Sequence, residues 1–207
     1  LAKLKQVPVT IQEWHNQRRI YRESHRSDLF TLGFATFFLN RCNRSGILDA
    51  GPIGGECQTG SYKIGARFNR KALVGKIEAL GDAKNKIEIY NLDAEELICK
   101  LMHERSSERL FMYLDPPYYR QGRRLYMNSF SPDDHARYAT LLQECNTIPW
   151  VLSYDNTKRI SSLYQKFPQY IKAIDYSAQT RRRDTELIIT QPWLRIRGNL
   201  EQIKGRI

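Results

Sequence analysis

One ten-residue stretch constrains the fold of this chain more than any other. The apolar run 110–114 leads directly into Asp115, two prolines and two tyrosines. A continuous apolar run bounded by prolines predicts a strand buried on both faces of a parallel sheet. Pro116 and Pro117 lack an amide hydrogen and have a fixed φ, so the strand must end before them. Asp115 is therefore expected at the carboxyl end of a strand, where open α/β sheets bind their ligands.

A carboxylate at this place, followed by a rigid turn and a ring, can hold a planar group that carries an amine. Asp115 and the carbonyl oxygen of Pro116 can accept the two amine hydrogens, and the ring of Tyr118 can cover the π face. The competing interpretation is a surface turn after an edge strand, with solvated aromatic rings. A four-residue motif is weak evidence without its context. Here an apolar run that predicts a strand comes directly before Asp115, and this context favours a binding site over a surface turn.

The rest of the chain alternates between helical and extended patterns. Capping residues and apolar residues at helical spacing predict helices over about 11–23, 28–41, 69–81, 93–102, 131–145 and 157–164. Apolar or alternating runs predict further strands at 86–90, 150–154, 173–177 and 186–190. Because strands alternate with helices, we expect an α/β fold with right-handed crossovers and a mostly parallel sheet, to which the last two strands add an antiparallel hairpin.

Charge and cysteine content narrow the class of protein. The 207 residues include 33 Lys and Arg against 22 Asp and Glu, a net charge of +11. Such an excess favours a polyanionic partner, nucleic acid first, over a merely basic protein. The four cysteines lie far apart and form no zinc-binding spacing with the four histidines, so we expect reduced thiols and no metal. The longest apolar run, 29–39, is too short to span a bilayer.

The motif Asp115-Pro116-Pro117-Tyr118 resembles the catalytic motif of amino-methyltransferases that act on adenine in DNA. Other segments resemble the Dam-like (D12 class) DNA adenine N6-methyltransferases, in the order of that family and over roughly residues 8 to 194. These segments are 38–41, 43–47, 66–69, 91–94, 115–119 and 151–156.

The resemblance implies a Rossmann-like methyltransferase sheet with an inserted target-recognition region. It also implies transfer of a methyl group from S-adenosylmethionine to the N6 amine of an adenine flipped out of double-stranded DNA. The catalytic residues would be Asp115, Pro116, Pro117 and Tyr118. The turn 91–94 would lie beside the adenine of the cofactor, so Asn91 and Asp93 join Asp115 as candidate cofactor-binding residues, although Asp93 also fits the cap of the next helix.

The segment 43–65 differs in composition from the helices on either side of it, because six glycines separate short polar and basic stretches. Such a segment suits either a flexible surface insertion or loops that closely follow another surface. In the family, the target-recognition region occupies this place. The residues that the resemblance places near the bases are Arg44, Ser45 and Ile47. Those that it places near phosphates are Arg41, Lys63 and Arg67.

Two later basic segments are further candidates for contact with DNA. Arg123 and Arg124 lie in a loop rich in arginine and tyrosine, which suits a nucleic-acid surface. Arg182 belongs to a run of three arginines in the expected terminal hairpin. Ordinary solvated loops are the alternative for both. The expected division of the chain is a helical part (1–41), a target-recognition insert (42–68), a catalytic α/β domain (69–194) and a basic tail (195–207).

One departure from the family bears on function. The family's cofactor site also uses a glycine-rich turn of the kind Phe-x-Gly-x-Gly ahead of the recognition region, and nothing between Leu1 and Phe30 resembles it. Either that segment precedes Leu1 in a longer protein, or half of the cofactor site has been lost. The abrupt start and the intact catalytic motif favour the first.

The second possibility makes the chain a non-catalytic DNA-binding module with a degenerate pocket. Amino transfer to cytosine or to a glutamine side chain is a third. The enzyme interpretation further implies a monomer in the cytoplasm, associated with the nucleoid of a prokaryote or encoded by a phage, and allows a cognate restriction endonuclease as a partner.

Overall fold

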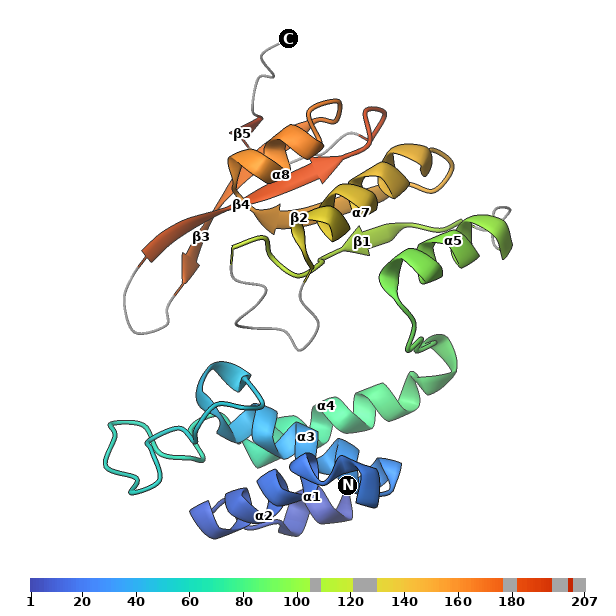
Figure 1. Ribbon diagram of the computed structural model, residues 1–207. Helices are drawn as coiled ribbons and strands as arrows, with labels where there is room; N and C mark the ends of the chain where they lie inside the picture. The colour runs from blue at the N-terminus through green and yellow to red at the C-terminus, as the bar shows by residue number, and fades with distance from the viewer. Residues whose placement is uncertain (105–108, 121–129, 177–181, 195–200, 203–207) are drawn as a thin grey trace. The chain divides into compact units, whose positions relative to one another are not determined.

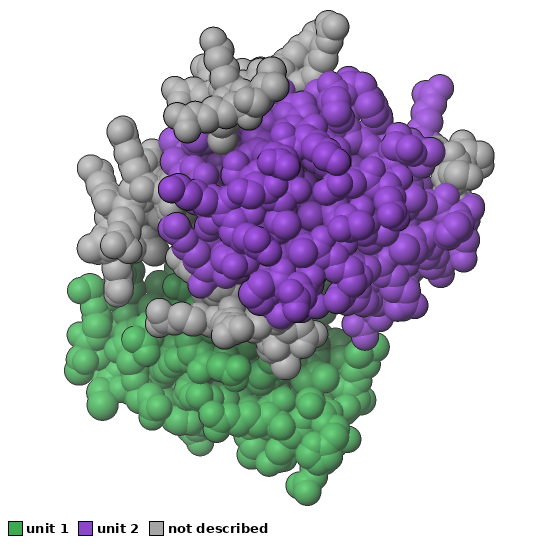
Figure 2. Space-filling model, turned by 45° about the horizontal axis from the view of Figure 1, so that its top comes forward, with its two compact units in different colours: residues 1–89 green, residues 90–207 purple. Residues whose placement is uncertain are grey.

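The computed structural model describes residues 1–104, 109–120, 130–176, 182–194 and 201–202. The chain forms two compact units, Leu1–Ile89 and Tyr90–Ile207 (Figures 1 and 2). The expected division of the chain, with boundaries after residues 41, 68 and 194, stays a prediction. Arg123 and Arg124 lie outside the described residues.

The first unit consists of helices and loops. Its helices are α1 (Ala2–Gln6), α2 (Ile11–Arg22), the 3-10 turn η1 (Ser24–Arg26), α3 (Leu29–Cys42), the 3-10 turn η2 (Arg44–Gly46), α4 (Arg70–Asp82) and the 3-10 turn η3 (Lys84–Lys86). Side-chain oxygens of Thr10, Asp28 and Asn69 cap α2, α3 and α4, and each accepts a hydrogen bond from a backbone N–H in the first turn. The predicted helix starts are confirmed here.

Aromatic side chains dominate the core of this unit. Trp14 and Phe38 are fully buried, and Phe38 packs against Phe68 with ring centroids 5.5 Å apart. The guanidinium of Arg70 donates to the backbone carbonyls of Leu4 and Val7, which attaches α1 to α4. The long segment between α3 and α4 therefore starts and ends on well-packed helices.

The second unit contains a five-stranded sheet covered by helices. Its elements are α5 (Ala94–Glu104), β1 (Met112–Leu114), α7 (Pro132–Glu144), β2 (Trp150–Asp155), α8 (Lys158–Leu163), β3 (Gln169–Tyr176), β4 (Arg182–Thr190) and β5 (Glu201–Gln202). The strand order is β1-β2-β4-β3-β5. Helices α7 and α8 lie along one face of the sheet (Figure 1).

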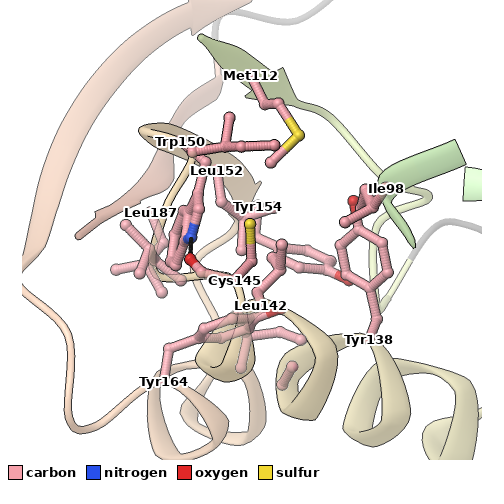
Figure 3. Packing of buried hydrophobic residues seen from close by; sticks show 14 residues of the cluster. Ile98, Met112, Tyr138, Leu142, Cys145, Trp150, Leu152, Tyr154, Tyr164 and Leu187 are labelled. Atoms are coloured by element: carbon pink, nitrogen blue, oxygen red, sulfur yellow. Dashed lines mark hydrogen bonds between the residues drawn. The ribbon is translucent and has the colours of Figure 1, made fainter. Parts of the chain in front are cut away.

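Alternate residues of the sheet face those helices. Trp150, Leu152 and Tyr154 of β2 are fully buried, and they pack with Leu142 of α7 and Tyr164 after α8 (Figure 3). The large apolar side chains of β2 thus alternate, as they must to share one face of the sheet, while Ser153 between them is buried as well. The core therefore fixes which side chains of β2 are left for the opposite face.

The sheet differs from the expected one in the direction of its strands. Among the described strands, β1 and β2 pair in parallel, whereas β2–β4, β3–β4 and β3–β5 are antiparallel. The fold is α/β with a small mixed sheet, and the prediction of a mostly parallel sheet is wrong for these strands. The predicted terminal hairpin is confirmed as β3 and β4. A Rossmann-like arrangement stays a prediction.

Two further expectations about strands are wrong. Residues 87–91 follow η3 without regular structure, and Ile89 is 90% exposed, because no described strand pairs with this segment. Strand β1 is buried on one face only. Met112 is buried, but Phe111 and Tyr113 are 59% and 63% exposed, since β1 is the edge strand of the described sheet and the helices cover its other face.

Two buried tyrosines give opposite predictions for stability. The hydroxyl of Tyr154 is 2.8 Å from Nδ1 of His135, whereas the buried hydroxyl of Tyr164 has no hydrogen-bond partner among the described residues. We expect Tyr154→Phe to lower the free energy of unfolding by about 1–3 kcal/mol, because it leaves a buried imidazole nitrogen unpaired. Tyr164→Phe removes an unsatisfied group and should leave stability unchanged or raised. Urea unfolding of both variants beside the unchanged protein measures the difference, and the reverse order would contradict the assigned hydrogen bonds.

Candidate active site

The carboxyl end of β1 lies beside polar groups from two neighbouring strands. Strand β1 ends at Leu114, so Asp115 is the first residue beyond it, and Pro116 behind it is buried. Asp115 itself is exposed. Partial burial nevertheless raises its pKa, and the negative charge of Glu186 raises it further. The carboxylate of Asp115 therefore lies at the protein surface at the end of β1, and Glu186 is close enough to raise its pKa.

Glu186 also holds the ring that follows the prolines. The hydroxyl of Tyr118 donates a hydrogen bond to Oε1 of Glu186, at 2.7 Å. Glu186 lies in β4, opposite Asp155 of β2 in the antiparallel register. One glutamate thus contacts Tyr118 directly and acts on Asp115 through its charge.

Asp155 holds the backbone of the same turn. Its two carboxylate oxygens accept hydrogen bonds from the backbone N–H groups of Tyr119 (2.8 Å) and Arg120 (3.0 Å). The next residue, Asn156, donates to the hydroxyl of Thr185 in β4, at 3.1 Å. The end of β2 therefore ties the turn after Pro117 to the centre of the sheet.

A buried histidine supports this turn from the helical side. The ring of His135, in the first turns of α7, packs against the rings of Tyr119 and Phe130, with centroids 5.1 and 5.3 Å away. Burial lowers the pKa of His135, while the charges of Asp155 and Asp134 oppose that shift. The imidazole is thus a packed, hydrogen-bonded part of the support beneath Tyr119.

Of the three candidate cofactor-binding residues, Asp115 belongs to this cluster, whereas no contact joins Asn91 or Asp93 to it among the described residues. Asn91 and Asp93 are both exposed. Oδ1 of Asp93 accepts the backbone N–H of Glu95 at 2.9 Å, which is the behaviour of a helix cap. The structure thus accounts for Asp93 by the capping alternative, and its contact with a cofactor stays a prediction, as does that of Asn91.

The candidates for DNA contact in the first unit gather in the segment between α3 and α4. Arg44 and Ser45 are exposed, and Ile47 is half-buried. The guanidinium of Arg41 donates to the side-chain oxygen of Asn40. Nη1 of Arg67 is 3.4 Å from the position that a Cβ on Gly46 would take. Three arginines and Ser45 therefore lie at or beside one turn.

The remaining candidates lie apart from that turn. Nζ of Lys63 donates to the carbonyl of Gln58, at 2.6 Å, in the second half of the segment. Arg182 opens β4 and pairs with Tyr176 in the sheet of the second unit. The structure does not describe the side chain of Arg182.

Three residues of the site were missed from the sequence: Glu186, Asp155 in its anchoring role, and His135. The motif at 151–156 marked Asp155 as part of the family pattern but not as an anchor. Glu186 comes before an apolar run and lies inside β4, so it lacks the signal that marked Asp115, which follows an apolar run at the end of a strand. His135 carries no such signal, because a histidine in a helix is most often part of the packing.

The described residues show neither a metal site nor a membrane-spanning helix. No group of three or more His, Cys, Asp or Glu side chains is placed to hold a metal ion among the residues that the structure describes. All four cysteines are free thiols. Within the same described ranges, no helix is both long and apolar enough to cross a membrane.

Comparison with known proteins decides the family. The family model for D12 class N6 adenine-specific DNA methyltransferases matches residues 10–179, well over half of the chain. The chain belongs to this family. No curated protein matches it. Membership indicates adenine methylation in DNA, and with it a DNA substrate and a methyl-donor cofactor. The match runs from the start of α2 to just beyond the end of β3, so it includes Asp115, Tyr118, Asp155 and the turn that carries Arg44, whereas Glu186 of β4 lies outside it.

The chain has some but not all of the features of a methyl-donor site. The exposed carboxylate of Asp115 at a strand end is a suitable neighbour for a bound methyl donor. Asp93 is used as a cap, and the glycine-rich turn that the resemblance requires is not found in residues 1–30. The described residues therefore fit part of a cofactor site and not the whole of one.

The electrostatic coupling between Asp115 and Glu186 can be measured without any assay of activity. We expect the carboxyl group of Asp115 to titrate above the ordinary aspartate pKa. Glu186→Gln should bring it down towards the ordinary value, because it removes a negative charge and keeps an oxygen for the Tyr118 hydroxyl. NMR titration of the side-chain carboxyl carbon measures both. Glu144→Gln, at the exposed end of α7, is the matched control, and an equal shift in that variant would show that the effect is not local.

Anchoring by Asp155 predicts the exchange behaviour of two amides. Asp155→Ala removes both acceptors, so the backbone N–H groups of Tyr119 and Arg120 should exchange with solvent faster than in the unchanged protein. In Asp155→Asn one oxygen remains, and the effect should be smaller. Hydrogen exchange followed by NMR measures it, with the amides of α8 as internal controls. Unchanged exchange at Tyr119 in Asp155→Ala would exclude the anchoring role.

Proposed function

We propose that this chain is a site-specific DNA methyltransferase, which transfers a methyl group from S-adenosylmethionine to the N6 amine of an adenine flipped out of DNA. The observation that carries the proposal is the Asp115-Pro116-Pro117-Tyr118 turn, held from β2 and β4 at the end of β1, in a chain of the adenine-specific family. The cofactor, when bound, supplies an electrophilic methyl group on a sulfonium.

The substrate base must first leave the duplex, because its amine faces the pairing partner. Extrusion costs a few kcal/mol of pairing and stacking, which contacts in the receiving site partly offset. Stacking on an aromatic side chain contributes about 1–3 kcal/mol per base. Tyr118 supplies such a ring, and its hydrogen bond to Glu186 limits the orientations that the ring can take before the base arrives.

Asp115 and the carbonyl of Pro116 act on the amine itself. Two acceptors that bind both amine hydrogens draw the nitrogen lone pair out of conjugation with the purine, and the nitrogen becomes more nucleophilic. Asp115 does not need to be a strong base, since the amine becomes acidic only once it is methylated. Catalysis of this kind rests on positioning and electrostatics, which agrees with a turn fixed by three hydrogen bonds to neighbouring strands.

Basic residues supply the attraction for the DNA backbone. The net charge of +11 favours a polyanion. Arg41, Arg44 and Arg67 provide cationic groups around one turn of the first unit, and we assign them to the contact with DNA, with Ser45 and Ile47 nearest the bases. Lys63, Arg123, Arg124 and Arg182 remain predicted phosphate contacts.

A second candidate function is a DNA-binding module with a degenerate pocket. The observation that favours it is the lack of a glycine-rich cofactor turn in residues 1–30. Binding of DNA without methyl transfer, even when the rest of a cofactor site is supplied in a longer chain, would support it. A cognate endonuclease, the monomeric state and the cytoplasmic location are further predictions that accompany the enzyme.

Substitution of Asp115 tests the enzyme directly. We expect Asp115→Asn and Asp115→Ala to lower methyl transfer by about 100- to 1,000-fold, the loss typical of one oriented electrostatic contact, with affinity for DNA changed little. Transfer is measured with labelled S-adenosylmethionine on the longest form of the protein that is active, and nucleoside digestion identifies the methylated base.

Tyr118→Phe is the matched control, because it keeps the ring and loses only the hydroxyl contact with Glu186. Its loss should be much smaller than that of Asp115→Ala. Full turnover in Asp115→Ala would exclude the proposed role of the carboxylate. Label in cytosine, or in protein, would exclude adenine as the substrate.

A further inference from the structure

We propose that the buried side chain of Asn43 is a positioning residue for DNA specificity, because it fixes the shape of the turn that carries Arg44, Ser45 and Ile47. We call residues 42–53 the recognition loop. The inference rests on the proposed function in one respect only, namely that this loop faces DNA. Asn43 itself is fully buried, so it acts through the loop and not by contact with a base.

The amide of Asn43 makes three hydrogen bonds, of which two hold the loop and the third goes to the helical core. Its oxygen accepts the indole N–H of Trp14 at 2.6 Å, and its nitrogen donates to the carbonyls of Ile47 (2.9 Å) and Leu48 (2.8 Å). Trp14 is fully buried in α2. A single side chain thus links the helical core to two successive carbonyls on the far side of the turn.

Backbone hydrogen bonds close the loop around this amide. The N–H of Arg44 donates to the carbonyl of Gly51 at 3.0 Å, and the N–H of Ile53 donates to the carbonyl of Cys42 at 2.8 Å. Asn43 and Pro52 form an antiparallel bridge. The loop is therefore a closed ring of chain with the Asn43 amide inside it, and the interpretation as a flexible insertion does not fit residues 42–53.

The tip of the loop has a conformation that needs such support. Ser45 has φ of 55° and Gly46 has φ of 75°, and a serine in the left-handed region is uncommon. The side chain of Asn40 donates to the carbonyl of Gly46 at 3.0 Å. Two asparagine amides, one buried and one half-buried, thus hold the carbonyls at 46, 47 and 48.

A fixed loop matters because discrimination between bases depends on geometry. A loop that must become ordered on every binding event loses affinity through conformational entropy, and it can adapt to several sequences. A loop fixed in advance presents Arg44 and Ser45 in one arrangement, so mismatched bases leave polar groups unpaired. Loosening the loop should therefore reduce sequence preference more than it reduces total affinity.

The decisive variants change donors into acceptors at constant size. In Asn43→Asp the carboxylate still accepts from Trp14 but repels the carbonyls of Ile47 and Leu48. Asn40→Asp does the same at Gly46 from a half-buried position, and it keeps the oxygen that accepts Arg41. Trp14→Phe is the matched control, because it removes the indole donor and leaves both loop carbonyls paired with Asn43.

The experiment is selection of bound DNA from a random-sequence duplex library by the full 207-residue chain, followed by sequencing. The preference is the ratio of affinities for the enriched sequence and a shuffled one. We expect Asn43→Asp to lower this ratio about tenfold or more, the size of one lost base contact, and Asn40→Asp to lower it less. Trp14→Phe should lower the melting temperature and leave the ratio within about twofold.

The outcomes separate this inference from the proposed function. If Trp14→Phe lowers the preference as much as Asn43→Asp does, or if neither aspartate variant lowers it, the positioning role is wrong. If Asn43→Asp fails to fold, Asn40→Asp decides, and an unchanged preference in that variant overturns the inference. Failure of methyl transfer with preference intact in the unchanged chain rejects the enzyme and leaves the inference standing. A chain that selects no sequence at all rejects the inference.

Discussion

Everything at the candidate active site depends on how a turn that contains two prolines is fixed. Pro116 and Pro117 have no N–H to donate, so the usual backbone ladder cannot continue past Leu114. The first amides available beyond them belong to Tyr118 and its successors, and the carboxylate of Asp155 accepts those of Tyr119 and Arg120. Hydrogen bonds to a charged acceptor are stronger than neutral ones. The turn is therefore held by β2 and by Glu186 of β4, and the position of Asp115 follows from theirs.

Local signals in the sequence were enough to find the elements but not the contacts between them. Helix starts could be predicted at Thr10, Asn69 and Ser131, because a capping side chain bonds to a backbone N–H only three residues further along the chain. The pairing of Glu186 with Asp155, by contrast, depends on an antiparallel register between strands some thirty residues apart. No short window of sequence contains that register, so Glu186 could not be placed beside Tyr118 from the sequence alone.

The failed strand predictions have a related cause. An apolar run reports that side chains avoid water, whereas a strand also needs a neighbour for its backbone. Residues 87–91 have the alternation but pair with no described strand, and Phe111 and Tyr113 have the apolar character but lie on a face that α7 and α8 do not cover. These errors do not change the predicted place of Asp115 directly after a strand, because that place depends on the end of β1 and not on the number of strands beside it.

The distribution of charge suits different groups of a nucleic acid at different places on the chain, namely phosphates at the arginines and base amines at the acids. The chain as a whole is strongly basic, yet its strand-end cluster contains three acids, Asp115, Asp155 and Glu186. Such a cluster repels phosphate and attracts groups rich in N–H donors, of which the exocyclic amine of adenine is one. Arginines around the recognition loop have the opposite preference. Under the proposed function, an extruded adenine would therefore meet acceptors for its amine at the strand-end cluster, while phosphates would be repelled from the same acids.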